Sequence, residues 1–133
     1  MAEPIPSDVS DLLTGGVLAH VGALRPDGSI AQYLMWVDYD GEHVLTSSTL
    51  GSRKGAHWRR DPHVTLSVVD ASDDWRYLVI RGRVIDMRPD EELAFIDRMS
   101  QRYTGLPYRF REASREIFVI EPEHVIASRG RRR

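Results

Sequence analysis

The sequence predicts a mainly β fold with helices, of the α+β class: a small antiparallel barrel, closed or split. Three observations lead to this prediction. Seven stretches have the residue pattern of short strands, tight turns join the first of them into two successive hairpins, and helical segments interrupt the series. The length of 133 residues suits one domain with one core. We therefore expect a single domain over residues 1–133.

The first half of the chain is expected to form two hairpins after a short helix. Ser7 can cap this helix, and Gly15-Gly16 ends it. The turn Arg25–Ser29 and the pair Asp40-Gly41 both contain Asp-Gly, which favours a tight reversal between strands. The helix and the strands of this half are expected over Ser7–Thr14, Val17–Leu24, Ile30–Asp38 and His43–Ser47.

The segment Thr46–Pro62, TSSTLGSRKGAHWRRDP, has the most informative local pattern. Hydroxyl residues close an apolar strand, Gly51 allows a close backbone approach, and a basic helix continues until Asp61-Pro62 stops it. Free N–H groups at a helix start, together with the helix dipole, favour a bound anion. Lys54, the only lysine of the chain, lies here. The pattern leaves two interpretations open, a phosphate site for a cofactor or a solvated basic helix face.

The second half is expected to contain four strands and one helix. Gly82 lies within the longest strand candidate, where a bulge or a bend is expected. Pro89 suits the first position of the helix, acidic residues follow in its first turn, and Gly105 ends it. The expected strands are His63–Asp70, Trp75–Met87, Glu116–Ile120 and His124–Ser128. The buried stripe of the helix is expected to be Leu93, Ile96, Met99 and Tyr103. Residues 106–114 are expected to be irregular or a short helix.

The distribution of charge favours a small anionic ligand over nucleic acid. The chain has a net charge of −2, which argues against a nucleic-acid-binding domain. Thr46–Pro62 carries +3 and Arg129–Arg133 carries +4, which leaves −9 for the remainder. Positive charge is therefore concentrated in two short places, as local capture of an anion requires. We expect residues 129–133 to form a mobile arginine tail.

The residue inventory excludes several kinds of chemistry. The chain has no cysteine, which removes disulfides, thiolate catalysis and cysteine–zinc sites. Its five histidines have no metal-ligand spacing, so no metal is expected. No apolar run is long enough to span a membrane, and the start lacks the pattern of a signal peptide, so we expect a cytoplasmic protein without a membrane partner. No catalytic constellation is present, and an enzyme with this inventory would take its reactivity from a cofactor.

Four segments follow one another along the chain: GVLAHVGALRPDGSI, MWVDYDGEHVLTSST, SRKGAHWRRDPHVTLSV and DDWRYLVIRGRVIDM. In this order they resemble the flavin and deazaflavin split β-barrel superfamily of the pyridoxamine 5'-phosphate oxidase-like kind. The third is close to the cofactor-helix signature of the family, a lysine followed by an Arg-Arg-Asp-Pro stop and a strand. The resemblance implies a split antiparallel β-barrel of the flavin mononucleotide (FMN)-binding type. It also implies a homodimer with cofactor sites between the subunits.

Within this superfamily the sequence is most similar to the actinobacterial branch that uses coenzyme F-420, an 8-hydroxy-5-deazaflavin with a phosphate and a polyglutamate tail. The resemblance implies that Lys54 contacts the anionic part and that Trp75 and Tyr77 of the second subunit cover the ring, although packing explains these aromatics equally well. The cofactor-binding residues so implied are Ser48, Thr49, Ser52, Arg53, Lys54, Trp75 and Tyr77. Met35 and Trp36 are candidates for the ring or substrate side.

The resemblance implies an F-420-dependent oxidoreductase that passes a hydride to a small conjugated acceptor, namely an enone, a quinone or a tetrapyrrole. Two departures from the family pattern, His57 in the cofactor helix and Leu34-Met35 before Trp36, leave the cofactor and the substrate open. The alternatives are an FMN-binding oxidase or flavin carrier on the same fold, and a non-catalytic protein that binds F-420.

Overall fold

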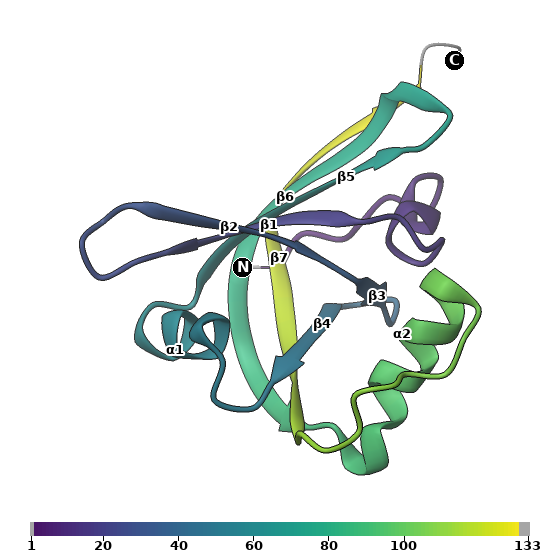
Figure 1. The fold of residues 1–133 in the computed structure, drawn as a ribbon. Coiled ribbons are helices and arrows are strands. Elements are labelled where there is room, and N and C mark those ends of the chain that lie inside the picture. The colour runs from purple at the N-terminus through teal and green to yellow at the C-terminus, as the bar shows by residue number, and fades with distance from the viewer. Residues whose placement is uncertain (1, 131–133) are drawn as a thin grey trace.

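The computed structural model describes residues 2–130, which form one seven-stranded antiparallel sheet and two α-helices (Figure 1). The order of strands in the sheet is β2-β1-β5-β6-β7-β4-β3. The strands are β1 (Ala19–Leu24), β2 (Ile30–Met35), β3 (Val37–Tyr39), β4 (Val44–Thr49), β5 (His63–Asp70), β6 (Asp73–Pro89) and β7 (Arg115–Arg129). The helices are the 3-10 turns η1 (Ser10–Leu13) and η2 (Glu91–Leu93) and the α-helices α1 (Arg53–Arg60) and α2 (Ala94–Thr104).

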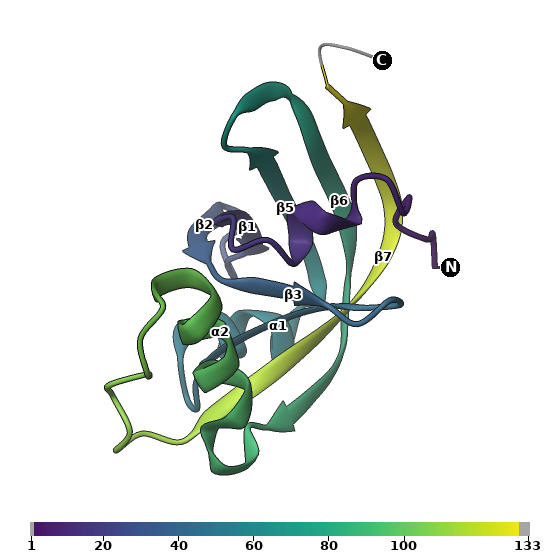
Figure 2. The same cartoon turned by 90° about the vertical axis from the view of Figure 1, so that its right-hand side faces the viewer.

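The two edge strands of the sheet, β2 and β3, are consecutive in the chain, so the sheet must curl. Only Trp36 separates them, yet β2 pairs with β1 and β3 pairs with β4. The single strand expected over Ile30–Asp38 is therefore wrong: the chain leaves one end of the sheet at Trp36 and enters the other. The result is the curled half-barrel visible in two orientations (Figures 1 and 2), which confirms the predicted split-barrel fold.

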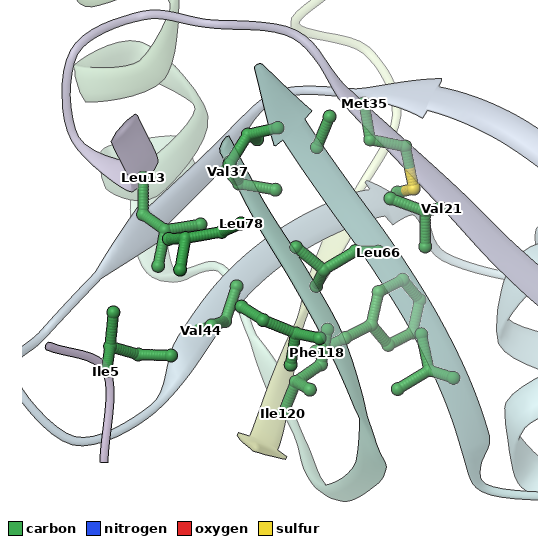
Figure 3. Close-up of a cluster of buried hydrophobic side chains, with 14 of the residues drawn as sticks. Ile5, Leu13, Val21, Met35, Val37, Val44, Leu66, Leu78, Phe118 and Ile120 are labelled. Carbon is green, nitrogen blue, oxygen red and sulfur yellow. The ribbon is translucent and has the colours of Figure 1, made fainter. Parts of the chain in front are cut away.

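The interior of the curled sheet holds the main hydrophobic core (Figure 3). Alternate residues of the strands point inward, as for Val21, Leu66 and Leu78, and Phe118 on β7 meets Trp58 of α1 edge to face at 4.9 Å. Helix α1 thereby anchors its apolar side to the core while its arginines stay exposed. A smaller core lies on the other face of β4 and β7, beneath α2; it contains Leu45, Phe95, Ile96, Met99 and Val119.

Strands β6 and β7 form a long bent ribbon that runs through the molecule (Figure 2). The pairing register shifts next to Gly82, as the sequence predicted. A Cβ atom at Gly82 would lie 2.1 Å from the carbonyl oxygen of Glu121, so the close approach of the two strands requires glycine. The predicted break at Glu121-Pro122 is wrong. Pro122 pairs opposite Gly82 at this irregularity, which lets β7 continue through it.

The helix predicted to begin at Pro89 begins later. Pro89 is the last residue of β6, and α2 starts at Ala94 after the turn η2. The buried carboxylate of Asp90 accepts hydrogen bonds from the backbone N–H groups of Phe95 at 2.8 Å and Ile96 at 3.0 Å. Asp90 thus satisfies the free donors of a helix that starts four residues further on.

The buried side of α2 differs partly from the prediction. Ile96 and Met99 are buried as expected, while Leu93 and Tyr103 are half-buried and Phe95 joins the buried set. Gly105 ends the helix with a positive φ of 75°, as predicted. Residues 106–114 are irregular.

The predicted boundaries also shift at both ends of the chain. The helix expected over Ser7–Thr14 is the 3-10 turn η1, and Ser7 does not cap it. Arg129 belongs to β7, and its Nε lies 2.7 Å from a carboxylate oxygen of Asp8, so the predicted tail does not include it. Residues 131–133 lie outside the described residues. Within residues 2–130, no helix is long and apolar enough to cross a membrane.

Candidate functional site

A cleft of about 250 Å³ lies between the start of α1, the ends of β2 and β4, the start of β7 and the inner side of α2. We call it the α1–α2 cleft. Its lining residues are Leu34, Met35, Trp36, Ser47, Ser48, Thr49, Lys54, Ile96, Met99 and Arg115. The strand-to-helix segment singled out in the sequence therefore forms one wall of the cleft.

The start of α1 brings Lys54 to this wall. Ser52 caps the helix, because its hydroxyl oxygen accepts a hydrogen bond from the backbone N–H of Gly55 at 3.2 Å. The ammonium of Lys54 lies 4.9 Å from the ring centroid of Tyr33, which holds the side chain across the end of β2. Burial lowers the pKa of Lys54 below its usual value, and the positive charge of Arg115 lowers it further. The two cations therefore act on each other across the cleft.

Arg115, at the start of β7, supplies the second cation. It pairs in register with Thr49, so the strand ladder places it beside the hydroxyl-rich end of β4. One guanidinium nitrogen donates to the Ser47 hydroxyl at 3.1 Å and another to the Tyr108 hydroxyl at 2.9 Å. The guanidinium also lies 5.2 Å from the centroid of the Tyr108 ring. Its Nε is buried and has no hydrogen-bond partner among residues 2–130.

The electrostatics of the cleft suit an anion. Two cations and three hydroxyl residues line it, and no carboxylate does so among the described residues. Glu116, which follows Arg115 in the chain, faces the opposite side of β7, where Arg59 neutralises it through two hydrogen bonds. An anionic group in the cleft would meet both uncompensated positive charges. The donor set thus fits the phosphate or carboxylates of a cofactor.

The other side of the cleft is apolar. Met35 and Trp36 enter from the end of β2, and Ile96 and Met99 face them from α2. The Trp36 ring stacks on Tyr103 with centroids 5.1 Å apart. The Tyr103 hydroxyl accepts a hydrogen bond from the backbone N–H of Val37 and donates to the carbonyl oxygen of Val17. A flat ring could rest against this side while its charged end met the cations.

The cleft brings together five of the nine predicted site residues: Met35, Trp36, Ser48, Thr49 and Lys54. Ser52 acts as the helix cap, and Arg53 is exposed on α1 without lining the cleft. Trp75 and Tyr77 lie on β6 near the tip of the β5–β6 hairpin, far from α1 in the same chain (Figure 1).

Sequence reasoning missed the cleft residues on other elements: Leu34, Ser47, Ile96, Met99 and Arg115. Ser47 was visible as part of the hydroxyl run. Arg115 carried no local signal, because it lies 61 positions after Lys54 and only the pairing of β7 with β4 brings it to the cleft.

A second hollow, of about 590 Å³, lies on the outer face of β1, β2, β5, β6 and β7. It contains Arg81 but also Glu123, together with His63 and His124. Charges of both signs line this hollow, so its electrostatic attraction for an anion is weaker than that of the α1–α2 cleft.

Comparisons with known proteins agree with this fold. Residues 13–129 match the family model described as pyridoxamine 5'-phosphate oxidase. An F-420 reductase of known structure is 31% identical with a TM-score of 0.84, and the match covers 92% of this chain and 98% of that chain. No curated protein matches.

Two further solved structures share the fold at lower identity. A putative pyridoxamine 5'-phosphate oxidase from Listeria innocua is 17% identical with a TM-score of 0.67, covering 90% of this chain and 94% of that chain. A conserved hypothetical protein from Mycobacterium tuberculosis is 19% identical with a TM-score of 0.71, covering 96% and 88% respectively. The family model spans nearly the whole described chain. This chain therefore belongs to the pyridoxamine 5'-phosphate oxidase family of flavin-binding, oxidoreductase-like split barrels.

Proposed function

We propose that this protein binds reduced coenzyme F-420 and passes its hydride to a small conjugated acceptor such as an enone, a quinone or a tetrapyrrole. The observation that carries the proposal is the α1–α2 cleft, where Lys54 and Arg115 face one cavity that no carboxylate of residues 2–130 lines. The similarity to an F-420 reductase over 92% of the chain supports the choice of this coenzyme.

Different residues of the cleft would bind different parts of the coenzyme. Lys54, Arg115 and the hydroxyls of Ser48 and Thr49 would hold the phosphate end. The capped start of α1 adds the positive end of its dipole. Met35 and Trp36 would lie against the ring or the acceptor. Arg53, exposed at the helix start, would serve the anionic tail outside the cleft.

A second copy of the chain would complete the site. Trp75, at 56% exposure, and Tyr77 lie on the β5–β6 hairpin and do not reach the cleft of their own chain. The outer face of the sheet also exposes Leu34 and Ile126, which lie in one row of paired residues with His20, Ser67 and Val79. Pairing of two such faces would bury Leu34 and Ile126 and bring the hairpin of one copy over the ring held by the other.

When bound, the deazaflavin supplies the hydride chemistry, and no side chain needs to donate a hydride. The chain would position the ring through its anionic end and hold the acceptor against the apolar side. The rigid Trp36–Tyr103 stack would limit movement of both partners. Closure by a second copy would exclude water from the reacting atoms.

Spectroscopic turnover tests the proposal directly. Reduced F-420 is mixed with the protein and each acceptor class, and its reoxidation is followed by absorbance and fluorescence. Enzyme-dependent reoxidation with at least one acceptor is expected. Tight binding of F-420 without turnover for any acceptor would instead identify a protein that only binds the coenzyme.

The FMN alternative rests on the family model, whose description names pyridoxamine 5'-phosphate oxidase, and on the resemblance of the sequence to flavin split barrels. Equilibrium titrations with F-420 and with FMN distinguish the two cofactors. Preference for FMN, together with rapid oxidation of the reduced complex by oxygen, would favour a flavin oxidase or carrier and overturn the proposal for F-420.

A further inference from the structure

Arg115, at the start of β7, is held by the hydroxyl groups of Ser47 and Tyr108. It has no carboxylate partner within residues 2–130, whereas Arg59, Arg102 and Arg111 each pair with an acid. Its two hydrogen bonds go to neutral hydroxyls, which orient the guanidinium without cancelling its charge. The full positive charge of Arg115 is therefore available to a ligand in the α1–α2 cleft.

Tyr108 fixes this orientation from the irregular segment between α2 and β7. Its hydroxyl accepts from one guanidinium nitrogen at 2.9 Å, and its ring lies against the guanidinium at 5.2 Å. Tyr108 itself packs against the smaller core beneath α2. Tyr108 thus orients the Arg115 guanidinium and connects it to the smaller core through its own packing.

Two uncompensated cations in one small cavity are unfavourable for the empty protein. Lys54 and Arg115 repel each other, and Lys54 is partly desolvated. A ligand group that carries two negative charges offsets this repulsion fully, whereas a singly charged group leaves one cation unpaired.

We propose that Arg115 is a second, specificity-determining cation of the cofactor site, that Tyr108 is its positioning residue, and that the pair Lys54–Arg115 selects ligands with two negative charges close together. The inference rests on the proposed function, because it concerns the same cleft. The required chemistry is a phosphate monoester, as in FMN, or a phosphate diester followed by a carboxylate, as in the tail of F-420.

Binding of phosphorylated and phosphate-free ligands tests the proposal. F-420, FMN and their phosphate-free forms, the deazaflavin ribityl fragment and riboflavin, are titrated by fluorescence against the wild type and R115Q. R115Q is expected to weaken binding of the phosphorylated ligands about 10- to 100-fold and to leave the phosphate-free forms within about 2-fold. The salt dependence of binding should also become shallower, because one ionic contact is lost.

Arg109 supplies the matched control. It lies on the same irregular segment, its guanidinium lies 5.4 Å from the centroid of the Phe110 ring, and it does not line the cleft. R109Q removes the same charge and should change no affinity by more than about 2-fold. Equal losses for R109Q and R115Q would assign the effect to general surface charge and overturn the proposal.

Tyr108→Phe tests positioning. It keeps the ring and removes the hydroxyl that accepts from Arg115, so it should weaken binding of the phosphorylated ligands less than R115Q does. In the double variant Y108F/R115Q, binding should be no weaker than in R115Q alone, because Tyr108 acts through Arg115. Additive losses, or equal losses for phosphate-free ligands, would show a merely structural role and contradict the assignment.

The outcomes separate this inference from the proposed function. If the wild type binds F-420 and R115Q binds it equally well, the inference fails while the function stands. If the wild type binds neither cofactor, the function fails, and calorimetric titration with inorganic pyrophosphate then tests the cation pair alone. Loss of pyrophosphate binding in R115Q but not in R109Q would support the pair, and equal binding in all three proteins would refute it.

Discussion

Replacing Lys54 by methionine should separate the affinity of the cleft from the stability of the fold. Lys54→Met keeps an unbranched side chain beside Tyr33 and removes the charge. Loss of a charge-assisted contact with the anionic group costs about 1–3 kcal/mol. The dissociation constant for F-420 should therefore rise by roughly 5- to 150-fold.

The unfolding free energy of the empty protein should respond differently. The pKa of Lys54 is lowered in the folded protein, so its charged form disfavours folding until the pH rises above the usual lysine range. Removing the charge relieves this cost at neutral pH. The lost interaction with Tyr33 is worth about 0.5–1 kcal/mol in the opposite direction. The net change in stability should stay within about 1 kcal/mol, which is small beside the effect on binding.

Fluorescence titration and chemical denaturation measure the two quantities on the same preparations. Arg53→Gln is the comparison, because Arg53 is the exposed neighbour that does not line the cleft. Its loss of affinity should be clearly smaller than that of Lys54→Met. If both variants lose affinity equally, general charge on α1 binds the cofactor and the reasoning from the cleft is refuted. A large loss of stability in Lys54→Met would refute the account of its repulsion by Arg115.

Three further outcomes are expected. Gly82→Ala should lower the unfolding free energy by about 1–3 kcal/mol or more, because the new Cβ would lie 2.1 Å from the Glu121 carbonyl oxygen. An unchanged denaturation midpoint would contradict the close approach of β6 and β7 at this residue. Burial opposes ionisation of Asp38, but hydrogen bonds from Arg102, the Tyr39 backbone and Arg98 outweigh it and hold its pKa below the usual value. The stability from ionised Asp38 is therefore present above the usual carboxyl pKa and is lost as the pH falls through the lowered value. Asp38→Asn should destabilise the protein at neutral pH, with a deficit that shrinks below about pH 4; a deficit constant with pH, measured by denaturation at each pH, would exclude this ionic role. Trp75→Ala should weaken self-association and F-420 binding but hardly change the unfolding free energy of the monomer, since Trp75 is 56% exposed. Light scattering measures the mass of the assembly and titration measures the affinity for F-420; if both are unchanged, Trp75 is not part of the interface.

Local patterns in the sequence predicted most of the elements, because each carries its own signal. Strand β5 follows from alternation, and the end of α1 follows from the Asp61-Pro62 stop. The start of α2 could not be predicted, because Pro89 favours a helix locally while the pairing of β6 with β7 extends through it. The capping role of Asp90 depends on a turn with positive φ at Glu92 and Leu93, which no propensity for these residue types indicates.

The candidate site was predictable only where it is contiguous in the chain. Ser48, Thr49 and Lys54 lie within seven positions of one another, and the pattern of a hydroxyl-rich strand end before a basic helix marked them. Arg115 and the α2 residues reach the cleft through strand register and helix docking, which are long-range consequences of the fold. The split of the expected second strand at Trp36 has the same origin, since closure of the sheet decides it.

The most direct test of the central claim is an experimental structure of the protein with F-420 bound. The account predicts that the phosphate of the coenzyme lies in the α1–α2 cleft, within hydrogen-bonding distance of Lys54 and Arg115, with the ring toward Met35 and Trp36. A coenzyme whose phosphate lies instead in the outer hollow beside His63 and His124, or anywhere that leaves Lys54 and Arg115 without contact, would contradict it.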